Sequence, residues 1–165
     1  LKLLKNPKHF IDKLKIYNAR AKDIQKEFIL LQDFIKHDFE WRVVRIGESF
    51  FAHKKLLYGE KASGSLDKSY STPPLSLLNF VKSLTDEQSL DSVSIDIFER
   101  NDEYIVNEIQ CIFGQSDEFQ MKVNGEIGKF NYINEKWKFE KGNFNTNENY
   151  DLRLAHAISK FKNKH

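Results

Sequence analysis

Two pairs of strand-like segments, each joined by a short turn, constrain the fold of this sequence more than any other feature. Residues 41–46 and 49–56 are rich in strand-forming residues and flank Gly47-Glu48, which suits a tight turn. Residues 92–99 and 104–110 form the second pair, in which alternating apolar and polar side chains would face opposite sides of a strand. The sequence therefore predicts two β-hairpins in an antiparallel sheet.

Proline positions and hydrophobic spacing predict the elements around the hairpins. Pro7 and the pair Pro73-Pro74 stand where helices begin, and apolar residues follow each of them at helical spacing. These patterns favour one α+β domain over residues 1–165, with the sheet backed by helices. The other predicted elements are a helix over 7–17, a buried strand over 27–35, a mobile surface loop over 59–72, a helix with Leu75, Leu78 and Val81 on one side, a β-type stretch over 119–139 and a last helix over about 150–161.

Charge and apolar content exclude several classes of partner. The formal net charge is +2, from 26 basic and 24 acidic residues, which gives no general attraction to nucleic acid or to a membrane surface. No apolar run approaches the roughly 20 residues of a membrane span. The single cysteine, Cys111, cannot form an internal disulfide, and we interpret it as a small buried hydrophobic residue. We expect a cytoplasmic protein with no nucleic-acid or membrane partner.

Oxygen-bearing side chains gather on one face of the second predicted hairpin. If the turn places Arg100 opposite Tyr104, then Asp96 lies opposite Glu108, and Gln110 shares the face of Glu108. Two facing carboxylates repel each other unless a cation or a proton lies between them, and carboxylate and amide oxygens suit a hard ion such as Mg²⁺. The alternative is that the two carboxylates are solvated on the open face of the hairpin. Spacing alone leaves both interpretations open.

The residues of this hairpin resemble the metal-binding hairpin of the ATP-grasp superfamily. Ser-Ile-Asp-Ile-Phe-Glu at 94–99 is followed by Tyr-Ile-Val-Asn-Glu-Ile-Gln at 104–110. In that superfamily, an acidic residue on one strand and a Glu-x-Asn on the next strand hold magnesium on ATP. The resemblance implies that Asp96, Glu108 and Gln110 bind Mg²⁺, with Gln110 standing where the family usually has Asn.

Residues upstream also resemble ATP-grasp segments, in the order that the family requires. Residues 29–34 resemble the hinge strand, which passes beside adenine and bonds it through its backbone, whereas an ordinary core strand is the alternative. Residues 40–55 resemble the following hairpin, in which an Arg and a later basic residue approach the ATP phosphates or the reacting acyl-phosphate. The resemblance implies nucleotide contacts from Leu31, Gln32, Asp33 and Phe34, catalytic roles for Arg42 and Lys54, and alternatives for those roles in Arg45 and Lys55.

The resemblance implies an ATP- and Mg-dependent ligase. Such an enzyme phosphorylates an unidentified carboxylate substrate, and an amine or other nucleophile then displaces phosphate from the acyl-phosphate. Residues 59–71 would cover the site, and Gly114 and Ser116 would approach the acceptor. We see no Gly-rich phosphate loop before the hinge, and Met121 is the only methionine, so we expect an N-terminally truncated ATP-grasp domain. The alternative is a non-catalytic nucleotide-binding or interaction module.

Overall fold

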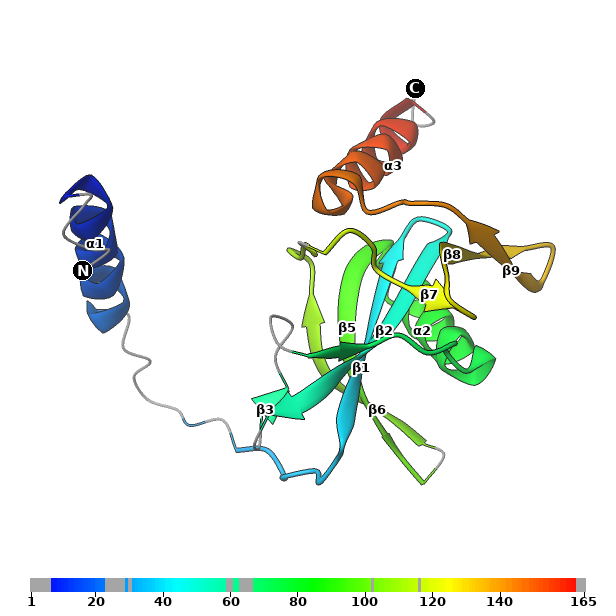
Figure 1. Cartoon of the computed structure of the whole chain (residues 1–165), viewed down its shortest axis with the longest axis horizontal. Helices are drawn as coiled ribbons and strands as arrows, with labels where there is room; N and C mark the ends of the chain where they lie inside the picture. The colour runs from blue at the N-terminus through cyan, green and yellow to red at the C-terminus, as the bar shows by residue number, and fades with distance from the viewer. Residues whose placement is uncertain are drawn as a thin grey trace. The chain divides into compact units, whose positions relative to one another are not determined.

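The chain divides into two compact units, Leu1–Phe34 and Ile35–His165, in the computed structural model (Figure 1). The expectation of a single domain over residues 1–165 stays a prediction. In the described part of the chain, no helix is long and apolar enough to cross a membrane. The structure describes residues 7–22, 29, 31–58, 61–62, 67–101, 103–115 and 117–162.

The first unit contains helix α1, Pro7–Lys22. The helix predicted over 7–17 is therefore confirmed, and it continues for another turn and a half. Pro7 is its first residue, which is the position where the missing amide proton of proline costs no helical hydrogen bond. Ile11, Leu14, Ile16 and Tyr17 are exposed on it.

The buried strand predicted over 27–35 is wrong for the residues that the structure describes. Ile29, Leu31 and Phe34 leave 84%, 85% and 76% of their surface exposed, and no strand includes them. A short apolar run becomes a strand only when a neighbouring strand takes its backbone hydrogen bonds, and none of the pairings among described residues involves this run. Glu27, Phe28 and Leu30 lie outside the described residues.

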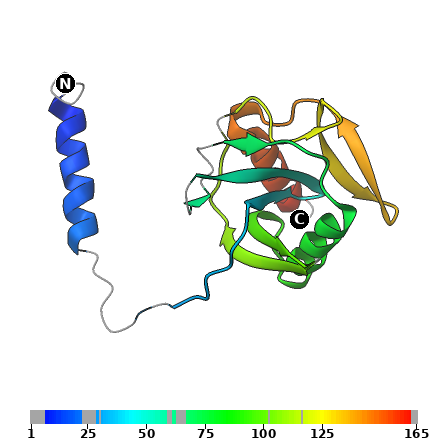
Figure 2. The same cartoon turned by 60° about the horizontal axis from the view of Figure 1, so that its bottom comes forward.

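The second unit is α+β, with an antiparallel sheet as predicted (Figures 1 and 2). Its strands follow the order β6-β5-β1-β2-β8-β7, so the two predicted hairpins lie side by side through β1 and β5. Short strands β3 and β4 also pair with β2, and β9 pairs with β8. The bounds are β1 Phe39–Ile46, β2 Ser49–Tyr58, β3 Lys61–Ala62, β4 Lys68–Ser69, β5 Ser92–Arg100, β6 Glu103–Gln110, β7 Lys122–Val123, β8 Glu126–Ile133 and β9 Lys136–Lys141.

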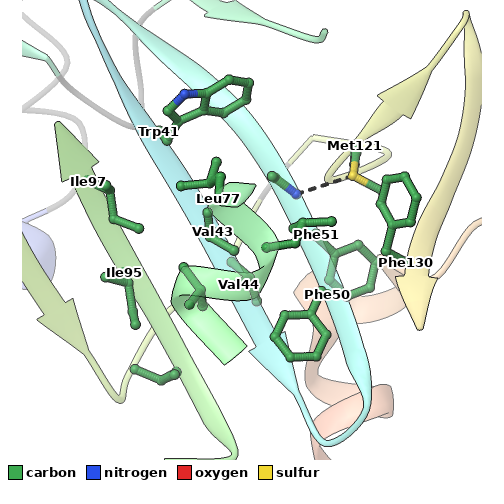
Figure 3. Packing of buried hydrophobic residues seen from close by; sticks show 14 of the residues in the cluster. Trp41, Val43, Val44, Phe50, Phe51, Leu77, Ile95, Ile97, Met121 and Phe130 are labelled. Carbon is green, nitrogen blue, oxygen red and sulfur yellow. Dashed lines mark hydrogen bonds between the residues drawn. The ribbon is translucent and has the colours of Figure 1, made fainter. Parts of the chain in front are cut away.

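Helix α2, Leu75–Glu87, packs against one face of the sheet. Pro74 precedes its first residue, as the sequence predicts, and the amides of Leu77 and Leu78 bond the Pro74 carbonyl. Leu77, Leu78 and Val81 are buried in the core, whereas Leu75 is half exposed, so the apolar side of the helix is shifted from the predicted one. Figure 3 shows Leu77 beside the sheet residues of this core, including Trp41, Val43, Ile95 and Ile97.

The edge of β2 that faces away from β1 pairs with β8 and with β4. Its start, Ser49–Phe50, pairs with β8, and Lys54–Lys55 pairs with β4. Between them, the amide of Ala52 donates to the Met121 sulfur at 3.3 Å (Figure 3). The thioether thus satisfies a buried amide in the gap between the two partners. Because β3 and β4 are paired strands, the prediction of an irregular mobile loop over 59–72 is wrong for Lys61–Ala62 and Lys68–Ser69.

The last described element is helix α3, Tyr150–Lys162, as predicted, and it follows the 3-10 turn η2, Thr146–Asn149. Arg153 of α3 donates to the backbone oxygens of Phe113 and Cys111 at 3.1 and 3.0 Å. These bonds attach the helix to the segment that follows β6. Cys111 itself is exposed, so its interpretation as a buried residue is wrong.

Candidate functional site

Four polar side chains form a row across four neighbouring strands. The ladder pairs His53 of β2 with Arg42 of β1, Arg42 with Asp96 of β5, and Asp96 with Glu108 of β6. Directly paired residues share a face, so the row lies on the side of the sheet opposite α2. Glu40 and Lys55, which also pair with each other, lie two residues along on the same face. We call these six residues the polar row.

The expected pairing of Asp96 with Glu108 is confirmed, but the turn does not have the expected register. Arg100 pairs with Glu103 rather than Tyr104, which alone would misalign the carboxylates by one residue. An irregularity between Asp96 and Ile97 restores the alignment, because Ile97 pairs with Val106 and leaves Asn107 as an extra residue. The bulged strand also turns Asn107 toward the row, where its amide nitrogen lies 3.4 Å from a Glu40 oxygen.

Asp96 is the centre of the ionic contacts in the row. Arg42 donates Nε and Nη2 to its two oxygens at 2.8 and 2.9 Å, and Lys55 Nζ lies 2.7 Å from Oδ2. Lys55 also lies 2.6 Å from a Glu40 oxygen and so bridges two carboxylates. The side chains of Asp96, Lys55 and Glu40 are at least 93% buried. Such a group persists in the interior only because each charge meets its opposite at hydrogen-bonding distance.

The contacts of Asp96 keep it ionised despite its burial. Burial by itself would raise the pKa of the Asp96 carboxyl, but the hydrogen bonds and charges of Arg42 and Lys55 outweigh that effect and hold the pKa below its usual value. The charge of Asp96 likewise outweighs burial and raises the pKa of Arg42. Glu108 adds a further negative charge near Arg42 and is exposed at the edge of the row. The polar row therefore has three carboxylates and two cations, which leaves one formal negative charge on the row.

The basic residues predicted for catalysis divide between the two faces. Arg42 and Lys55 lie in the polar row, but Lys54 lies on the opposite face, with Nζ 3.8 Å from the ring centre of Phe39. Arg45 also lies on that face, where it donates to Thr85 at 2.7 Å and to Asp86 at 2.5 Å. The structure thus does not bring the side chains of Lys54 or Arg45 to Asp96 and Glu108, because adjacent residues of a strand point to opposite sides.

The remaining predicted site residues are less closely gathered. Gln110 pairs with Ser94, next along the face from Glu108. Gly114 is exposed, and Ser116 lies outside the described residues. In the ranges that the structure describes, no three His, Cys, Asp or Glu side chains gather as a metal-binding group, so any metal needs amide or substrate oxygens as further ligands. The residues expected to bind adenine, Leu31, Gln32, Asp33 and Phe34, are exposed parts of the first unit.

Sequence reasoning missed His53 as a member of the site. Its side chain is fully buried, and Nδ1 lies 2.9 Å from the carbonyl oxygen of Gln120. Burial is the main cause that lowers the pKa of His53 to about 4, so the ring is neutral at pH 7 and Nδ1 is the protonated donor. Period-two spacing from Lys55 would have placed His53 on the same face, but strand pairing was needed to put it beside Arg42.

A second polar cluster lies beside His53. Lys68 of β4 lies 2.5 Å from Asp117, and the Tyr70 hydroxyl donates to the same carboxylate at 3.1 Å. The hydrogen bond from Lys68 is the main cause that lowers the pKa of Asp117, whereas burial and that carboxylate raise the pKa of Tyr70 to about 12. The Tyr70 ring centre is 5.8 Å from that of His53. Asp117 therefore ties β4 to the segment that carries Gln120.

Comparisons with known proteins do not identify a relative. No protein-family model matches this sequence, and it matches no curated protein and no solved structure. The function must therefore be argued from the polar row and from the resemblance of the two hairpins.

Proposed function

We propose that this chain carries the C-terminal part of an ATP-grasp domain and that its parent protein is an ATP- and Mg-dependent ligase of the cytoplasm. The substrate would be a carboxylate, activated as an acyl-phosphate and attacked by an amine or another nucleophile. The family resemblance supplies the reaction type. The polar row is the observation that carries the proposal, since it joins Arg42 and Lys55 of one hairpin to Asp96 and Glu108 of the other.

The charges of the polar row fit a bound magnesium ion. Its three carboxylates exceed its two cations by one formal charge. Glu108 is exposed, and none of the described hydrogen bonds or ion pairs uses its carboxylate oxygens. Carboxylate and amide oxygens are hard ligands, and magnesium in such sites usually completes its shell with water and phosphate oxygens. Asp96, Glu108 and Gln110 are the residues that would hold it. Magnesium would neutralise charge on the β- and γ-phosphates.

Arg42 and Lys55 are the residues that would stabilise the transferring phosphoryl group. Both lie next to the proposed metal ligand Asp96, and burial around them strengthens their electrostatic effect on a bound anion. Lys55 takes the role expected for Lys54, because only Lys55 faces Asp96. The segment of residues 67–70, held by Asp117 beside His53, would help to exclude water from this face.

A calorimetric titration of ATP, with and without magnesium chloride, tests the proposal. The resemblance implies further subdomains before the hinge. The titration is therefore run in parallel on the 165-residue chain and on a protein that also contains the natural sequence upstream of Leu1. We expect magnesium-dependent binding that Glu108→Gln weakens at least tenfold. Glu126→Gln is the matched control, since Glu126 is an exposed strand carboxylate paired with Lys141 far from the row. Absence of binding to folded, extended protein would overturn the proposal.

A non-catalytic module is the second candidate, and one observation favours it. Both oxygens of Asp96 already have protein partners in Arg42 and Lys55, so the buried contacts of the row are satisfied without a metal. In that case the row would stabilise the sheet, and the module would at most bind a nucleotide without catalysing a reaction. Magnesium-dependent ATP binding without carboxylate-dependent release of ADP by the extended protein would support this candidate over the ligase.

A further inference from the structure

His53 has a buried acceptor atom that the described contacts leave unused. Its Nδ1 is paired with the Gln120 carbonyl, which fixes the proton there and leaves a lone pair on Nε2. Nε2 is fully buried and has no hydrogen-bond partner among the described residues. A buried acceptor without a donor destabilises the folded state, so native proteins rarely keep one without a use.

Arg42 is the donor best placed to use this atom. It stands between His53 and Asp96 in the row, as the direct cross-strand partner of both. Directly paired side chains have Cβ atoms about 4.5–5.5 Å apart, within the reach of a guanidinium group that turns about its own side-chain bonds. Arginine carries five N–H donors, of which two are bonded to Asp96 in the structure.

We propose that His53 is a positioning residue that receives Arg42 when Asp96 no longer binds it. Bound to Asp96, the guanidinium occupies the oxygens that a metal ion would need. Once those oxygens bind a cation, Arg42 would meet a second positive charge there, and Nε2 of His53 offers an uncharged acceptor on the other side. Arg42 would then remain in the row, turned away from the metal, with other N–H groups free for phosphate. The role of magnesium rests on the proposed function, whereas the movement of Arg42 does not.

The neutral state of His53 is what makes it suitable for this role. A charged imidazolium would repel the guanidinium and has no lone pair on Nε2. Burial is the main cause that disfavours a second proton on the ring, and the charges of Lys68 and Arg42 add to it. The carbonyl of Gln120 holds the one proton on Nδ1, so the lone pair stays on Nε2. Lys68 is bonded to Asp117 and Gln115, and Lys55 is bonded to Glu40 as well as to Asp96. Among the described contacts, Arg42 is therefore the cation whose bonded side chain is Asp96 alone.

Nitrogen NMR of the His53 ring tests the inference directly. Asp96→Asn removes the charge that holds Arg42 and leaves an amide group with one accepting oxygen in place of two. We expect the ¹⁵N resonance of His53 Nε2 to move from the position of a free acceptor toward that of a hydrogen-bonded one, and the Arg42 Nε–H to stay protected from exchange. Adding His53→Phe to Asp96→Asn should reduce this protection, because the oxygen of Asn at position 96 is then the only acceptor of the two that remains for Arg42.

Asp86→Asn is the matched control. It also removes a carboxylate from an arginine, Arg45, but on the opposite face and away from His53. The His53 resonance should not move in this variant. An unchanged resonance in folded Asp96→Asn would overturn the inference. If Asp96→Asn does not fold, the double variant with Lys55→Met removes one charge of each sign and is read in the same way.

A magnesium chloride titration of the wild-type protein separates this inference from the proposed function. Shifts at Asp96 and Glu108 together with a shift at His53 Nε2 support both. Shifts at the two carboxylates with an unchanged Nε2 support the metal site and overturn the role of His53. No shift at either carboxylate counts against the magnesium site, and the Asp96→Asn spectrum then decides the movement of Arg42 by itself.

Discussion

Lys54 and Lys55 are neighbours in β2 but lie in opposite environments. Lys55 is buried and bridges Glu40 and Asp96, whereas Lys54 lies across the sheet over the rings of Phe39 and Trp41. One step along a strand reverses the face, so identical side chains meet a pair of carboxylates on one side and two aromatic rings on the other. Their contributions to stability should differ accordingly.

Replacing each lysine by methionine measures this difference. Lys55→Met leaves two buried carboxylates with one cation fewer, so we expect the free energy of unfolding to fall by about 3–5 kcal/mol. Lys54→Met keeps the apolar stem and loses only cation–π contacts, for which we expect about 0.5–2 kcal/mol. Urea unfolding of the two variants is the measurement. Equal losses would contradict the assignment of the two side chains to opposite faces.

The buried His53 makes stability depend on pH. Burial is the main cause that lowers its pKa to about 4, whereas the unfolded chain has the ordinary value of about 6.5. Between these values the unfolded state binds more protons, so the free energy of unfolding should fall as pH drops from about 6.5 to about 4, by up to about 3 kcal/mol. Above pH 6.5 this residue contributes no further change.

Urea unfolding at a series of pH values checks this dependence. His53→Gln removes the titrating ring, so its stability should vary less with pH in that window than the stability of the wild type. Asp96 does not interfere there, because its lowered pKa places its contribution at more acidic pH, where protonation of the carboxylate destabilises the fold. Parallel pH profiles for the wild type and His53→Gln would rule out the buried neutral ring.

At the scale of elements, the turn between β1 and β2 packs closely against helix α3. Gly47 has φ of +57°, and its amide donates to the Asp91 carbonyl at 2.7 Å. A Cβ at this position would lie 2.7 Å from Nδ1 of His156. Gly47 is therefore needed twice, for its left-handed backbone and for the space that the α3 side chain occupies. The turn and the helix pack together only because this residue has no side chain.

Alanine substitutions separate the two requirements. Gly125 also has positive φ, but a Cβ there meets nothing within 4 Å, so Gly125→Ala reports backbone strain alone, about 1–2 kcal/mol. Gly47→Ala should cost more, because it adds the clash with His156. The double variant Gly47→Ala with His156→Ala should recover that excess in a double-mutant cycle of unfolding free energies. Strict additivity of the two changes would show that the clash is absent.

At the scale of the second unit, Asp117 joins parts of the chain that are distant in sequence. Its carboxylate binds Lys68 and Tyr70, while Asn145 donates to the backbone oxygens of Gln115 and Asp117. Next to β4, whose Lys68 binds Asp117, the amide of Leu56 donates to the Asp67 carbonyl at 2.9 Å. The segment before α2, the segment after β6 and the approach to α3 therefore meet beside the polar row.

Asp117→Ala should release β4 from the sheet edge. We expect faster hydrogen exchange of the Leu56 amide, and the pKa of His53 should rise from about 4 toward about 6.5 as water reaches the ring. Amide exchange and an NMR titration of the ring are the measurements. Glu118→Ala is the control, since Glu118 is an exposed neighbour. If both variants behave like the wild type, Asp117 does not hold β4 in place.

The sequence alone determined the local elements of this protein. Gly47-Glu48 and Pro73-Pro74 placed a hairpin and a helix correctly, because turn and helix-start preferences act within a few residues. The pairing of Asp96 with Glu108 was also predicted, although the assumed pairing of Arg100 with Tyr104 was wrong by one residue. The bulge at Asn107 restored the register between the turn and Asp96. The strand predicted over 27–35 was wrong for the described residues, because local composition cannot supply the neighbouring strand that a β-strand needs for its backbone hydrogen bonds.

Only the tertiary structure decided which side chains form the polar row. The choice of Lys55 over Lys54 needed the faces of β2, and the position of His53 beside Arg42 needed the ladder between β1 and β2. The contact of Arg42 with Asp96 joins residues of two hairpins that a helix separates in the chain. Local preferences act over a few residues, whereas strand pairing is set by burial of the whole sheet face, and the candidate site exists only at that longer range.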